Sequence, residues 1–324
     1  GTMNSANAAA LVLGENSTNA SNGINASGTP ATLNVAGADT VNVADFDLVV
    51  TGLDGTATAF SLGAITGTAT DNDTAPTLQL ILQEDGAIAQ NITVASVTFT
   101  ADNDTAGLID LDSADAAGVS GSFTFTGDVD TGIFGTTRGI IDIDMANSSA
   151  TTPRTTVIFG GNVSSLIRFD QAAELVSITT NGTSAQTITG TLNSDGGDGE
   201  GTLNLTGTGG VTFASAVGKA TDGALLLVNI DTAATFDGAV EATNFTVDAD
   251  STFTGAVTAN TAFTVAGATT DVTITAASAL GTLTATAGTV TANGLITTVN
   301  TVNTAGKIYL NVAENEMGAG KYTA

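Results

Sequence analysis

The chain has 324 residues, is rich in glycine (39 residues) and carries 32 Asp or Glu against 6 Lys or Arg, which gives a formal charge of −26 at pH 7. The absence of His and Cys excludes Ser-His-Asp and Cys-His nucleophilic catalysis, zinc fingers and cysteine-held iron–sulfur clusters. Six scattered cations are too few to neutralise a nucleic-acid backbone, so no nucleic-acid partner is expected.

Residues 1–30 are predicted to form a flexible or capping segment ahead of the main domain. Residues 14–30 combine Asn, Ser, Thr, Gly and Pro, which favour turns and loops over regular structure. The apolar stretch at residues 6–13 is interrupted by Asn7 and is far shorter than the roughly 18–20 residues of a spanning helix. We therefore expect no membrane insertion of this chain.

Residues 31–324 are predicted to form one all-β domain. Short segments such as 91–100, 122–126, 202–206 and 271–275 alternate Val, Ile, Leu or Phe with Thr, Ser, Asn or Asp. Alternation with a period of two, carried by β-branched residues, is typical of half-buried strands. Glycines and Asn-Gly or Asp-Gly pairs separate these segments, which indicates turns between the strands.

A repeated pattern within this domain suggests how the strands are arranged. Phe-x-(Gly/Ser)-x-Val begins at Phe125, Phe159, Phe213, Phe236 and Phe253, and the last three copies are 23 and 17 residues apart. A unit of about 20 residues with uneven insertions is typical of a solenoid whose turns stack on one another. We therefore predict a parallel β-solenoid in which the repeated Phe residues stack inside. Tandem β-sandwich domains are the alternative.

Pairs of aspartates two residues apart are the candidate metal ligands, because residues i and i+2 of a strand share a face and Ca²⁺ prefers oxygen ligands. The duplicated sequence Asp-Asn-Asp-Thr-Ala, at 71–75 and 102–106, predicts weak calcium sites at Asp71, Asp73, Asp102 and Asp104. The competing interpretation is a solvated polar face without metal. No other cofactor is predicted.

Two further acidic segments have plainer interpretations. In 110–112 and 142–144 the aspartates flank an apolar residue, which predicts that the carboxylates point outward from strands with buried alternates. Residues 196–203 (GGDGEGTL) are similar to a single calcium-binding nonapeptide. One required aspartate is replaced by Gly201, and we therefore predict a flexible turn there.

The stretch 202–218 (TLNLTGTGGVTFASAVG) resembles the stem of autotransporter passenger domains, closest to the rickettsial surface-antigen type. The tail, from 307–312 (KIYLNV) through 318–323 (GAGKYT), resembles the end of such stems. The likeness covers roughly residues 120–324. Bacterial surface-layer proteins and phage tailspikes share this pattern of short alternating segments. It implies a right-handed parallel β-helix, export to the cell surface and a structural or adhesive role, and it carries over no functional residue.

These features predict an extracellular, non-enzymatic surface protein that forms a rigid stalk or part of a surface layer. Its partners would be other copies of itself or a ligand on a host or cell surface. One alternative is a β-sandwich subunit of a self-assembling surface filament or lattice. Another is a tailspike-like β-helix that binds or degrades polysaccharides with two carboxylates, although the chain has no Trp and only two Tyr to form a sugar platform.

Overall fold

The computed structural model describes short strands within residues 1–68, and residues 77–82, 90–100, 106–113, 121–145, 155–169, 176–194, 199–219 and 223–311. The described part is all-β without a helix, which confirms that the domain is built of strands. Consequently, no helix in the described segments is long and apolar enough to cross a membrane. The chain divides into two compact units, Gly1–Ser177 and Ile178–Ala324.

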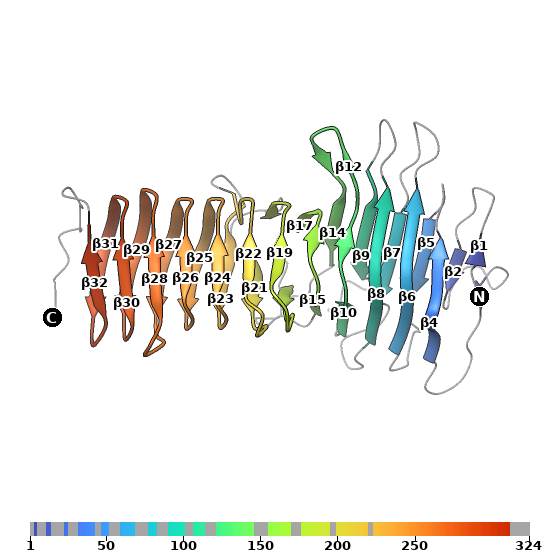
Figure 1. Cartoon of the computed structure of the whole chain (residues 1–324), viewed down its shortest axis with the longest axis horizontal. Helices are drawn as coiled ribbons and strands as arrows, with labels where there is room; N and C mark the ends of the chain where they lie inside the picture. The colour runs from blue at the N-terminus through green and yellow to red at the C-terminus, as the bar shows by residue number, and fades with distance from the viewer. Residues whose placement is uncertain are drawn as a thin grey trace. The chain divides into compact units, whose positions relative to one another are not determined.

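In the first unit, one series of parallel strands pairs each strand with a strand further along the chain (Figure 1). Its order is β1 (Met3–Asn4), β4 (Thr32–Asn42), β6 (Ala59–Thr68), β8 (Gln90–Thr100), β10 (Gly121–Phe125) and β15 (Thr155–Phe159). The second half of β8 pairs with β11 (Val129–Asp130), which pairs with β16 (Val163–Ser164).

A second parallel series of the first unit alternates with the first along the chain. Its order is β3 (Gly23–Ile24), β2 (Leu11–Leu13), β5 (Asp47–Thr51), β7 (Thr77–Leu82), β9 (Leu108–Ser113), β14 (Ile140–Asp144) and β17 (Leu166–Phe169). Three described strands, β1, β2 and β3, therefore lie within residues 1–30. Along β9 and β14, Ile and Leu at every second position are fully buried, as the alternation predicted.

The second unit also consists of two parallel series. One runs through β18 (Ser177–Thr180), β21 (Glu200–Leu205), β23 (Leu225–Ile230), β25 (Val240–Val247), β27 (Val257–Val265), β29 (Ser278–Ala285) and β31 (Ile296–Asn303). The other runs through β19 (Gln186–Ile188), β22 (Val211–Phe213), β24 (Ala234–Phe236), β26 (Ser251–Phe253), β28 (Asp271–Ile274), β30 (Thr289–Ala292) and β32 (Lys307–Leu310). A short strand, β20 (Leu192–Ser194), follows β19.

The repeated phenylalanines stack inside the second unit. Phe213, Phe236 and Phe253 occupy the same position of β22, β24 and β26, and their side chains are buried. The ring centroids are 5.1 Å apart for the first pair and 4.9 Å for the second, with nearly parallel planes. This confirms the predicted internal stack, and its spacing follows from the roughly 4.8 Å between neighbouring strands.

The valines of the same repeat follow the phenylalanines in register. Val217 pairs with Val240, which pairs with Val257, and all three are buried. Parallel pairing of every second strand is compatible with a β-helix. It differs from the antiparallel sheets of the β-sandwich alternative.

The third position of the repeat is small because turns of successive strands pack backbone against backbone. A Cβ atom added to Gly238 would lie 2.4 Å from the carbonyl carbon of Ser215. A Cβ added to Gly255 would lie 2.2 Å from the carbonyl oxygen of Gly238. The Gly or Ser of the repeat therefore reflects close stacking of turns.

Candidate functional sites

The predicted calcium ligands Asp71, Asp73, Asp102 and Asp104 lie outside the described residues. Within the part of the chain that the structure does describe, no group of three or more acidic side chains is placed so that it could hold a metal ion. Calcium binding at the duplicated motif therefore stays a prediction.

An acidic row crosses four neighbouring strands of the first unit. The register of β7, β9, β14 and β17 aligns Gln79, Asp110, Asp142 and Arg168, which are 31, 32 and 26 residues apart. Gln79 Nε2 donates to Asp110 Oδ2 at 2.9 Å, and Arg168 Nε donates to Asp142 Oδ1 at 3.0 Å. Arg168 and Asp142 also form a salt bridge, in which the Asp142 side chain is 15% exposed. The two carboxylates of this row therefore lie between two hydrogen-bond donors, Gln79 and Arg168.

Partial burial sets the electrostatics of this row. Burial raises the pKa of Asp110 to about 6, and the negative charges of Asp112, Asp142 and Asp144 add to the effect. The hydrogen bond from Gln79 lowers the pKa but does not offset these causes. Asp142 pairs with the Arg168 guanidinium, and Asp110 accepts a hydrogen bond from the neutral amide of Gln79. As predicted, these aspartates alternate with buried Ile and Leu on their strands.

The glycine-rich segment that resembles a calcium nonapeptide has a structural role where it is described. Glu200 begins β21 and is buried, and its carboxylate accepts a hydrogen bond from the Ser194 hydroxyl. The flanking Gly199 and Gly201 have φ angles of +85° and +64°, which non-glycine residues rarely adopt. The prediction of a flexible turn is therefore wrong for residues 200–203, because the unusual backbone and the buried carboxylate belong to a strand.

A groove with a volume of about 480 Å³ is lined by residues of five strands of the second unit, β19, β22, β24, β26 and β28. Four threonines at one register position of β22, β24, β26 and β28 contribute to its lining, and small neighbours such as Gly209, Gly210 and Ala233 leave the space open. The four threonines are Thr212, Thr235, Thr252 and Thr273. The row extends to Thr187 in β19 and Thr291 in β30.

Two exposed carboxylates, Asp250 and Asp271, also line this groove. Asp250 Oδ1 accepts a hydrogen bond of 2.8 Å from the backbone N–H of Asp271, which fixes one carboxylate beside the other strand. The groove therefore offers hydroxyl groups and negative charge together. The sequence showed the alternating threonines, but only the register aligns them.

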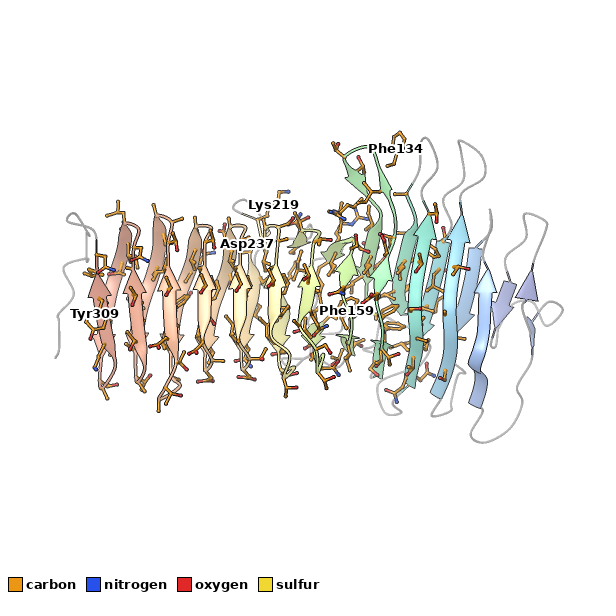
Figure 2. All side chains as sticks on the ribbon, viewed as in Figure 1. Phe134, Phe159, Lys219, Asp237 and Tyr309 are labelled. Carbon is orange, nitrogen blue, oxygen red and sulfur yellow. The ribbon has the colours of Figure 1, made fainter. Side chains whose placement is uncertain are left out.

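A hairpin of the first unit interrupts the parallel arrangement. Strands β12 (Ile133–Phe134) and β13 (Thr137–Arg138) pair antiparallel around a two-residue turn (Figure 1). Ile133 is 49% exposed, and Figure 2 shows Phe134 at the outer end of the hairpin. The pattern Gly-Ile-Phe-Gly at 132–135, an apolar pair between glycines, is the signal that could have indicated this hairpin.

No protein family, curated protein or solved structure matches this chain.

Proposed function

We propose that the protein is an extracellular, non-enzymatic structural or adhesive component of a bacterial cell surface, built as a right-handed parallel β-helix. The observation that carries the proposal is the in-register stacking of strands from β19 to β32, in which alternate side chains of the strands from β19 to β30 are buried. Repetitive stacking of this kind gives each turn the same neighbours and yields a stiff element that needs no catalytic centre.

The proposed mechanism is geometric. Backbone hydrogen bonds join each strand to the next one of its series, and stacked rings such as Phe236 and Phe253 resist sliding between turns. A net charge of −26 keeps neighbouring molecules soluble through repulsion, and divalent cations would relieve that repulsion where molecules meet. The protein would act as a stalk or as a unit of a surface layer.

Electron microscopy of the purified chain tests the structural role. Narrow rods would support a stalk, and ordered filaments or sheets would support a surface layer. Rounded particles without a constant width would contradict both forms of the proposal.

A parallel assay tests the non-enzymatic part against the polysaccharide-degrading alternative. Neutral and acidic polysaccharides are incubated with the protein, and reducing ends and unsaturated products are measured. We expect no turnover. Turnover that is lost in an Asp110→Asn, Asp142→Asn variant would show that the acidic row is catalytic and would overturn the proposal.

A further inference from the structure

The β12–β13 hairpin is held by hydrogen bonds at its base and displays apolar side chains. The backbone N–H of Gly132 donates to Asp130 Oδ1 at 2.9 Å, and Gly139 N donates to the Gly132 carbonyl at 3.0 Å, which closes the base of the hairpin. Among the phenylalanines whose burial is described, Phe134 is the one that is not buried. Exposed apolar residues on a preorganised support lose little entropy on binding and are typical interface anchors.

The hairpin also carries one of the six cations of the chain. Arg138 pairs across the hairpin with Ile133, so both side chains lie on the same face. Arg138 Nη1 donates to Ser164 Oγ at 2.8 Å, which orients the guanidinium. A guanidinium has five N–H groups, so this bond leaves donors for a carboxylate of a partner.

The threonine-lined groove of the second unit has complementary properties. Its volume of about 480 Å³ lies in the range that receives small ligands or a few side chains, and a folded domain would not enter it. Asp250 and Asp271 supply exposed carboxylates, while exposed Ala233 supplies apolar surface. An occupant with one cation beside an apolar tip therefore matches the groove.

We propose that the hairpin of one copy of this chain inserts into the threonine-lined groove of a second copy, with Arg138 facing Asp250 and Asp271. A chain of charge −26 repels its own copies, and a contact that places one of its few cations against carboxylates lowers that repulsion locally. The hairpin and the groove are different surfaces of the same chain. Each copy therefore has one hairpin and one groove, and the contact can repeat from molecule to molecule along a row. This inference rests on the proposed function and supplies the contact between units of a surface assembly.

Sedimentation velocity of the full-length chain over a range of concentrations tests the contact. Wild type should associate as concentration rises. Arg138→Glu, or Asp250→Lys with Asp271→Lys, should weaken the association at least about tenfold, since like charges would then meet. Ile133→Ser should weaken it as well, because Ile133 is 49% exposed on the same face as Arg138. Leu295→Ser, at another exposed apolar residue, and Lys307→Glu, an equal charge reversal elsewhere, are controls that should leave it unchanged.

The decisive experiment mixes the Arg138→Glu protein with the protein that carries Asp250→Lys and Asp271→Lys. Each protein alone meets a like charge at the contact, whereas the mixture pairs a negative hairpin with a positive groove and the native hairpin with the native groove. Association should return in the mixture. The inference is overturned if wild type stays monomeric, if Arg138→Glu associates as wild type does, or if mixing restores nothing. Rods in micrographs of a strictly monomeric protein would refute this contact and leave the structural role standing.

Discussion

Removal of one ring from the middle of the phenylalanine stack should strongly destabilise the second unit. Phe236 is fully buried and has Phe213 at 5.1 Å on one side and Phe253 at 4.9 Å on the other. The strands on both sides are held by ladder hydrogen bonds, so the space left by Phe236→Ala cannot close by bringing strands together. We expect a cost in unfolding free energy of about 3–5 kcal/mol, toward the upper end because two ring contacts are lost.

A double-mutant cycle measures whether these rings contact one another as the structure shows. Phe236→Ala and Phe253→Ala, alone and together, are compared by urea unfolding followed by circular dichroism. Coupling of at least about 0.5 kcal/mol is expected because the rings are neighbours. Phe213→Ala with Ile274→Ala is the matched control, since Ile274 pairs with Phe253 in the next strand of the same row. These two positions are three strands apart, roughly 14 Å, so their effects should add.

Two results would refute this reasoning. Additive effects of Phe236→Ala and Phe253→Ala, with both single variants destabilised, would mean that the rings are not neighbours. A cost below about 1 kcal/mol for Phe236→Ala would mean that the position is not in a packed core. Hydrogen exchange of the amides of β24 and β26 reports the same perturbation locally, which assigns the loss to this unit.

Three further outcomes are expected. The pKa of Asp110 is about 6 in the folded protein and about 3.9 when unfolded, so its contribution to stability falls as pH rises from about 4 to 6. After allowance for solvent screening, Asp110→Asn should therefore be more stable than wild type by roughly 1 kcal/mol at pH 7.5. Below pH 4 the two proteins should be equally stable. A difference in melting temperature that stays constant across this pH range would contradict this reasoning. Gly255→Ala should cost about 1–3 kcal/mol in urea unfolding, because the added Cβ meets the Gly238 carbonyl at 2.2 Å; an unchanged midpoint would contradict the close stacking. If the duplicated motif binds calcium, millimolar Ca²⁺ should raise the melting temperature more than NaCl of equal ionic strength, and Asp73→Asn with Asp104→Asn should abolish the difference; equal responses would remove the site.

The sequence by itself determined that the chain forms β-strands and which side chains lie in the interior of the second unit. Alternation with a period of two assigns each residue to the inner or outer face, because successive side chains of a strand point in opposite directions. The repeated Phe-x-(Gly/Ser)-x-Val pattern then predicted that Phe213, Phe236 and Phe253 stack, although the copies are 23 and 17 residues apart. The sequence also showed that the third position of the repeat is small. The reason, which is the close contact between Ser215, Gly238 and Gly255, came only from the structure.

Only the tertiary structure decided which outward residues meet. Gln79, Asp110, Asp142 and Arg168 are separated by unequal stretches of chain, and their alignment depends on the register of long-range parallel pairing. The groove beside Asp250 likewise requires small residues from several strands to coincide, which no local pattern encodes. Alternation fixes the face of a side chain, but its neighbours on that face depend on how insertions between strands shift the register.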